Sequence, residues 1–216
     1  ALVARYYIRY GAQELPEDGS LPELTWEGAG HVERLVMIGP PNAGALDALL
    51  HLTSGIKPGT FFPTYPAAIV GTMPSAYQLL PRSRHQAILG SSGNPIKDLY
   101  APELWRQNQW GLADPRQEEV LKNLLPEIQS ASKRRQIALD HQAKALRRAK
   151  HFAEAMDRPA RPPFGVQLFL VAGDAKTTNK TAQFDAQGNL RIVEKGPGDG
   201  SVLRSSALLD ERLGSE

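Results

Sequence analysis

The sequence predicts an α/β fold, because two apolar strand-like runs enclose a long stretch of helical and proline-rich sequence. The runs cover residues 32–39 and 166–172, and each leads into a turn that contains glycine. Continuous apolar runs of this kind are typical of strands buried on both faces, as in a parallel sheet covered by helices. Residues 181–185 and 190–194 flank a four-residue loop and predict a β-hairpin. Two buried strands and a hairpin amount to half of a doubly wound sheet.

Composition narrows the class of protein. The chain has 216 residues with 41% hydrophobic content, enough for a substantial core in one domain or a domain with an insertion. The formal net charge is only +2, so we expect no nucleic-acid partner for the chain as a whole. Cysteine is absent, which rules out disulfides and thiolate chemistry and favours a reducing, cytoplasmic location. No apolar run approaches the roughly 18 residues of a membrane span.

A helix is predicted at the start of the chain, over residues 1–10. Arg5 and Arg9 lie four residues apart, apolar residues share the other side, and Gly11 is placed to cap the C-terminus. The first strand follows after a loop rich in proline and glycine. It runs into a rigid turn at residues 40–44, and open α/β sheets place their functional loops at such strand ends.

The segment from residue 45 to residue 163 is interpreted as a largely helical cap or lid. Nine prolines between residues 58 and 126 forbid any long uninterrupted helix there. Seven of the fifteen aromatic residues of the chain also lie in this part, more than a polar surface excursion needs. We expect an apolar underside that binds substrate, and an alternative is that the aromatics only anchor the cap. The expected substrate-contacting residues are Phe61, Phe62, Tyr65 and Tyr77.

One long helix is predicted over about residues 133–158, after Ser132 and before Pro159. It carries eight Lys or Arg residues against three Asp or Glu residues. A basic amphipathic helix of this kind binds an anionic membrane or a phosphate backbone in some proteins. The commoner explanation is the solvated face of a packed helix, and no nucleic-acid motif accompanies the charge.

The strongest candidate for chemistry is Asp199, in the turn at residues 196–200. Glycines on both sides of this carboxylate make a turn that lifts it clear of its neighbours, because Gly198 and Gly200 accept positive φ and close backbone approach. A helix over residues 202–213 is predicted to follow. The alternative is an ordinary solvated turn. The turn residues expected to shape the site are Asn42, Gly44, Gly198 and Gly200.

Three stretches, taken together and in this order, carry a resemblance to a known family. They are Leu35 to Gly44, Met73 to Pro81 and Gly198 to Ala207. They resemble an α/β-hydrolase of the lipase type, and most of all the lecithin:cholesterol acyltransferase-like group and its bacterial relatives. The first resembles the strand and turn after the nucleophile helix, with Pro40 where the family usually has Thr. The second resembles part of the family's lid, and the third its catalytic-acid loop.

The opening residues 1–7 resemble the helix that directly follows the Gly-x-Ser-x-Gly elbow in this family. By this resemblance the nucleophilic serine lies just before Ala1, and no Gly-x-Ser-x-Gly occurs in the chain. The family's histidine follows the acid, whereas all five histidines here precede Asp199. With no initiating Met and no signal peptide in the printed sequence, we expect the natural chain to extend beyond both ends. The histidines, interpreted as surface or satisfied polar residues, are His31, His51, His85, His141 and His151.

The resemblance implies that the intact protein is a serine hydrolase of lipid or acyl esters, a lipase, esterase or acyltransferase. Residues 1–44 and 164–216 then form the C-terminal half of the hydrolase core, which we expect to be inactive by itself. Asp199 takes the role of the triad acid, and Asp174, close behind the second strand, is the alternative. No cofactor or metal is implied, and a membrane surface is an expected contact. The alternative function is a non-catalytic module that binds anionic lipid or nucleic acid through residues 133–158.

Overall fold

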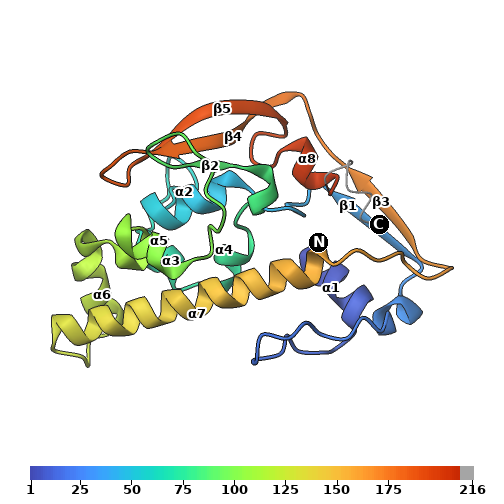
Figure 1. Ribbon diagram of the computed structural model, residues 1–216, viewed down its shortest axis with the longest axis horizontal. Coiled ribbons are helices and arrows are strands. Elements are labelled where there is room, and N and C mark those ends of the chain that lie inside the picture. Colours follow the sequence, from blue (N-terminus) through green and yellow to red (C-terminus); the bar gives the residue numbers. More distant parts are fainter. Residues whose placement is uncertain (210–216) are drawn as a thin grey trace. The chain divides into compact units, whose positions relative to one another are not determined.

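Residues 1–209, which the computed structural model describes, mix helices with strands in two small sheets (Figure 1). The predicted α/β class is confirmed at this level. The described chain forms two compact units. The first contains residues 1–45, 151–180 and 195–209, and the second contains residues 46–150 and 181–194. The predicted division into a hydrolase core and a cap stays a prediction.

Two parallel strands form the sheet of the first unit. β1 (Arg34–Ile38) pairs in parallel with β3 (Gln167–Val171), with Val36 opposite Phe169 and Ile38 opposite Val171. The two strands are more than 120 positions apart in the sequence, so their pairing confirms the predicted parallel arrangement. The helices that lie wholly in this unit are α1 (Leu2–Tyr10), the 3-10 helix η1 (Glu27–His31) and α8 (Arg204–Ala207).

One face of this sheet is exposed, so the expectation of strands buried on both faces is wrong for the described residues. Met37 is buried on the inner face, whereas its neighbour Ile38 is 77% exposed on the outer face. Val36, Phe169 and Val171 share the outer face with Ile38, and each is about half exposed. Alternate residues of the two strands therefore face opposite ways. One set faces the core of the unit, and the other set forms an apolar surface that no residue in 1–209 covers.

Helix α1 forms as predicted and is followed by Gly11 at φ 62°. Its basic side is not solvated, however, because Arg5 and Arg9 are both buried. The Arg5 guanidinium donates to the carbonyl of Met156, and the Arg9 guanidinium donates to the carbonyl of Arg158. Hydrogen bonds to carbonyl groups offset the free-energy cost of removing the two guanidinium groups from water. The pattern of polar and apolar residues along the sequence does not show that the two arginines are buried.

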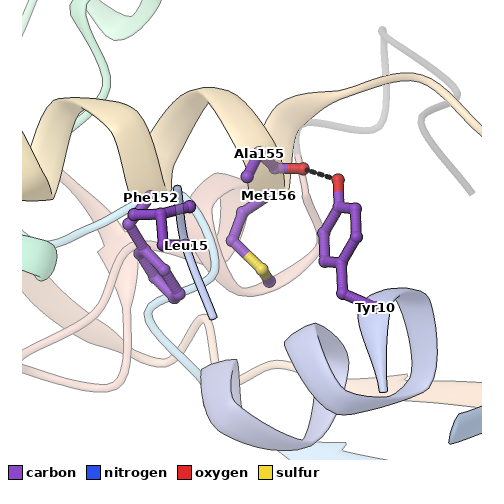
Figure 2. Close-up of a cluster of buried hydrophobic side chains, with 5 residues drawn as sticks. All are labelled: Tyr10, Leu15, Phe152, Ala155 and Met156. Atoms are coloured by element: carbon purple, nitrogen blue, oxygen red, sulfur yellow. Dashed lines mark hydrogen bonds between the residues drawn. The ribbon is translucent and has the colours of Figure 1, made fainter. Parts of the chain in front are cut away.

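A cluster of buried side chains joins α1 to the end of α7 (Ala131–Asp157) within the first unit. Figure 2 shows its members, which are Tyr10, Leu15, Phe152, Ala155 and Met156. The hydroxyl of Tyr10 donates to the carbonyl of Ala155 at 2.6 Å, so the one polar atom of the tyrosine is satisfied inside the cluster (Figure 2).

Helix α7 confirms the predicted long helix, since its 27 residues begin at Ala131 and end at Asp157. Leu146 and Ala149 are buried on the side that packs, while Lys144 and Arg147 are exposed. Among residues 1–209, no helix combines the length and the apolar character that a membrane crossing requires.

Short helices build most of the second unit, as its prolines predict. Pro74 and Pro102 occupy the first positions of α4 and α5, where a missing N–H breaks no hydrogen bond of the helix. The α-helices before α7 are α2 (Leu46–Ser54), α3 (Ala67–Gly71), α4 (Pro74–Gln78), α5 (Pro102–Gln107) and α6 (Glu118–Leu124). The 3-10 helices are η2 (Ser83–His85), η3 (Gly111–Ala113) and η4 (Pro115–Gln117).

A row of aromatic rings lies at the centre of the second unit. Tyr77 packs on Trp105 with ring centroids 5.8 Å apart, and Trp105 packs edge-on to Trp110 at 5.7 Å. Trp110 continues the row to Phe184 at 5.3 Å and donates its indole N–H to the carbonyl of Gly188. These side chains are buried, so they hold the second unit together.

The predicted hairpin is confirmed and is longer than its apolar pattern indicated. β4 (Lys176–Phe184) and β5 (Leu190–Gly198) lie side by side, and β2 (Ile88–Leu89) pairs in parallel with β4. At the tip the Asp185 carboxylate accepts the backbone N–H groups of Gln187 and Asn189. The two residues of β2 are too few to produce a periodic pattern, and the sequence did not predict this strand.

The helix predicted over residues 202–213 is much shorter in the structure. α8 begins at Arg204 and ends at Ala207, and a turn follows. Residues 210–213 of the predicted helix lie outside the described residues.

Candidate active site

Asp199 lies beside the carboxyl ends of both parallel strands of the first unit. A Cβ atom added to Gly39, the residue after β1, would lie 3.0 Å from the Oδ2 of Asp199. A Cβ atom added to Gly173, two residues after β3, would lie 3.2 Å from the Cβ of Asp199. The two strand ends therefore carry glycines where the aspartate approaches. This edge of a parallel sheet is where α/β proteins hold their functional side chains.

The two oxygens of the Asp199 carboxylate differ in their surroundings. Oδ1 accepts the backbone N–H groups of Val202 at 2.8 Å and Ser201 at 2.9 Å. These two hydrogen bonds lower the pKa of Asp199 below its ordinary value, and the nearby charge of Lys176 adds a smaller effect in the same direction. Oδ2 accepts no hydrogen bond from any residue in 1–209. The carboxylate is thus ionised at neutral pH, fixed in orientation and left with one open acceptor.

The two glycines beside Asp199 are required for different reasons. Gly200 has φ 103°, in the region that residues with a Cβ atom rarely adopt. Gly198 does not have positive φ, so that expectation is wrong, and close packing explains it instead. A Cβ atom on Gly198 would lie 2.4 Å from the hydroxyl oxygen of Thr178 and 2.4 Å from the carbonyl oxygen of Val202.

Asp174, the alternative acid, has no fixed orientation in the structure. It is exposed and lies three residues after β3. No residue in 1–209 donates a hydrogen bond to its carboxylate, and it does not cap the turn after its strand. A carboxylate that orients a catalytic group has to be held in place, and this geometry favours Asp199.

A buried polar network connects the turn after β1 to the segment that follows Asp199. Asn42 is fully buried, donates to the carbonyl of Ala207 at 2.8 Å and accepts from the Arg5 guanidinium at 3.3 Å. The buried hydroxyl of Ser206 donates to the carbonyl of Gly44 at 2.6 Å. Gly44 has φ 83°, so this turn requires a glycine. The network holds α8 against the end of β1, and α8 follows closely on Asp199 in the sequence.

Replacing Asn42 with alanine should lower the free energy of unfolding by about 1–3 kcal/mol, because the buried carbonyl of Ala207 loses its donor. Asn94 provides a matched control, since it is an exposed asparagine whose amide donates only to the hydroxyl of Ser92. Its replacement by alanine should change stability by less than about 0.5 kcal/mol. Equilibrium urea unfolding measures both variants, and equal losses would contradict a structural role for Asn42.

None of the five histidines is bonded to Asp199 in the described chain. His31 precedes β1 and therefore lies near its amino end, whereas Asp199 is at the carboxyl end, about 16 Å away along a five-residue strand. The ring of His151 is hydrogen-bonded to the carbonyl of Ser20. His51, His85 and His141 belong to the second unit.

The four aromatic residues predicted to contact substrate differ in their exposure to solvent. Phe61, Phe62 and Tyr65 are exposed in the loop between α2 and α3. Tyr77 is fully buried, its hydroxyl donates to the carbonyl of Gly71 at 3.0 Å, and burial raises the pKa of its phenol. Tyr77 therefore acts as an anchor of the second unit, while the three surface residues remain predicted contacts.

A cavity of about 740 Å³ in the second unit has a polar lining. The side chains of Gln109, Gln187 and Asn189 line it beside the ion pair of Asp114 and Arg116, whose charged atoms are 3.0 Å apart. Such a lining suits a hydrogen-bonding ligand and not an acyl chain, which an apolar wall would favour.

Several lysine and arginine side chains of α7 form hydrogen bonds or ion pairs with other residues of the second unit. Arg134 donates to the carboxylate of Glu118, and Arg135 donates to a backbone carbonyl. Lys150 forms an ion pair with Asp98 at 2.8 Å. This pattern fits the solvated face of a packed helix and leaves fewer cations for an anionic partner.

No protein-family model and no curated protein matches this sequence. Within residues 1–209, no cluster of His, Asp or Glu side chains is arranged to hold a metal ion. The candidate site therefore rests on Asp199 and its surroundings.

Proposed function

We propose that this chain contributes the catalytic acid to a serine hydrolase of the α/β type that acts on lipid or acyl esters. The observation that carries the proposal is the state of Asp199. Its carboxylate lies beside the carboxyl ends of two parallel strands, with Oδ1 held by two backbone N–H groups and Oδ2 open. A triad acid needs this combination of a fixed orientation, a stable negative charge and one open acceptor.

In the proposed mechanism Asp199 acts on a histidine and not on the ester itself. Its open Oδ2 accepts the Nδ1–H of the imidazole, which fixes the tautomer whose Nε2 removes the proton of the serine hydroxyl. The serine oxygen then attacks the acyl carbonyl, and the negative charge of Asp199 stabilises the imidazolium that forms. The proposal assigns the serine and this histidine to polypeptide outside the printed sequence, as the resemblance to lipase-type hydrolases implies.

The exposed apolar face of the two-stranded sheet in the first unit supports the proposal. Parallel strands are almost always buried on both faces within larger sheets, and a sheet of two strands is marginal by itself. Here the outer face of β1 and β3 is exposed and apolar, including Ile38 and Val36. Further strands and a covering layer, as an α/β-hydrolase has, would bury this surface.

The proposed lid is the predicted segment 45–163, most of which belongs to the second unit. Phe61, Phe62 and Tyr65 are available on its surface for contact with an acyl chain, whereas the row of rings around Trp105 is already used for packing. Hydrolysis and transfer to an alcohol acceptor both follow from the same acyl-enzyme and depend on which nucleophile reaches it.

The test is whether the full-length gene product reacts as a serine hydrolase. We expect a fluorophosphonate probe to label it covalently, and heat denaturation before labelling to abolish the signal. Turnover of acyl esters should be lost in proportion to labelling. A folded full-length product that neither reacts with the probe nor hydrolyses any acyl ester would overturn the proposal.

A further inference from the structure

The loop between α2 and α3, residues 55–66, is closed at its base and held in shape. Ile56 and Tyr65 exchange two backbone hydrogen bonds, of 2.9 and 2.8 Å, which join the two ends of the loop. Gly55 has φ 80° at the point where the chain leaves α2. Three prolines within the loop, Pro58, Pro63 and Pro66, further restrict its backbone. The loop is therefore a preformed element, and binding through it costs little conformational entropy.

Two adjacent aromatic rings project from this loop into solvent. The side chain of Phe61 is 99% exposed and that of Phe62 is 57% exposed, and Tyr65 is exposed at the base. Because the Phe61 ring is exposed on all sides, it protrudes from the surface of the protein and is not part of a flat apolar patch. Adjacent exposed aromatics are unfavourable in water, and their presence on a rigid loop marks an interaction surface.

The charge of the surrounding sequence indicates the kind of partner. Between Asp47 and Asp98 the chain contains no Asp or Glu residue over 50 positions, while it contains three lysine or arginine residues that are exposed. Those residues are Lys57, Arg84 and Lys97. Lys57 belongs to the loop itself, four residues before Phe61. A protruding aromatic pair with a cation in the same loop, and no carboxylate in that stretch of the sequence, complements a surface that is apolar inside and anionic outside.

We propose that the loop 55–66 binds an anionic lipid surface, with Phe61 and Phe62 inserted below the headgroups and Lys57 paired with lipid phosphate. Insertion removes the two rings from water, and the tied base keeps the polar backbone at the level of the headgroups. This surface is distinct from α7, whose exposed face carries Asp140 and Glu154 as well as cations. The proposal concerns attachment and does not depend on Asp199 being a catalytic acid.

Vesicle flotation of the full-length protein tests the attachment. We expect binding to phosphatidylcholine vesicles that contain phosphatidylglycerol. The Phe61→Ser, Phe62→Ser double variant should partition at least about tenfold more weakly, because burial of the exposed Phe61 ring alone contributes a factor of about ten or more. Phe164→Ser is the matched control, since Phe164 is fully exposed in the first unit. Lys57→Glu should weaken binding to anionic vesicles, whereas Lys144→Glu on α7 should not.

A second measurement keeps the test independent of any loss of folding. Phe61→Trp retains an aromatic ring, and its added fluorescence should shift to shorter wavelength and be quenched by brominated lipid when anionic vesicles are present. Phe164→Trp should show neither effect. Absence of vesicle binding by the wild-type protein, an unquenched Trp at position 61, or losses confined to the α7 variant would each overturn the proposal. Ester turnover plays no part in these readouts, so they separate this proposal from the proposed catalysis.

Discussion

Replacing Asp199 with asparagine in the full-length protein should lower kcat for ester hydrolysis by about 10⁴ with little change in melting temperature. The asparagine side chain is isosteric, and its oxygen still accepts the N–H groups of Ser201 and Val202, so the turn keeps its shape. The group at the open position becomes an amide, which stabilises the wrong tautomer of the histidine and supplies no charge to the imidazolium. KM should stay close to the wild-type value, because the acid does not touch the substrate.

Asp174→Asn is the matched control for this measurement. Asp174 lies near the same strand end, but nothing in the described chain holds its carboxylate. We expect its replacement to leave kcat within a few-fold of the wild-type value. If Asp174→Asn abolished turnover while Asp199→Asn remained active, the assignment of the acid would be wrong.

Local patterns predicted α1 and the two parallel strands of the first unit, and they predicted α7 and the shortness of the other helices in the second. Gly11, the prolines at helix starts and the apolar strand runs act within a few residues of themselves, so their effects are visible in the sequence. Burial of Arg5 and exposure of Ile38 depend instead on which carbonyls or side chains the rest of the chain brings near. No periodic pattern contains that information.

In the candidate site, too, local features were predictable from the sequence and contacts between distant segments were not. The sequence marked Asp199 through its flanking glycines, and it marked Asn42 and Gly44 as turn residues. It did not show that Gly39 and Gly173 lie against the aspartate, or that Asn42 and Ser206 connect the two segments. Gly173 lies 26 positions from Asp199, and the other contacts join residues more than 100 positions apart, so all of them lie beyond the reach of a local pattern. The available signal was a glycine at the end of each predicted strand, Gly39 as the last residue of the first run and Gly173 directly after the second, since both strand ends meet at one edge of a parallel sheet.

Trp105→Ala should lower the free energy of unfolding by about 3–5 kcal/mol, the largest loss expected of any single aromatic in the second unit. The side chain is fully buried, contacts the rings of Tyr77 and Trp110, and donates its indole N–H to the carbonyl of Leu99 at 2.7 Å. Removing it leaves a cavity between two rings and an unpaired buried carbonyl, and both effects destabilise. Equilibrium urea unfolding followed by circular dichroism gives the difference in stability.

Phe61→Ala is the control that separates anchoring aromatics from binding aromatics in the same unit. Because Phe61 is almost fully exposed, its truncation should change the free energy of unfolding by less than about 0.5 kcal/mol. Trp105→Phe should fall between the two, since it keeps a ring against Tyr77 but leaves the Leu99 carbonyl without its donor. A loss below about 1 kcal/mol for Trp105→Ala would mean that the row of rings is not the core of this unit.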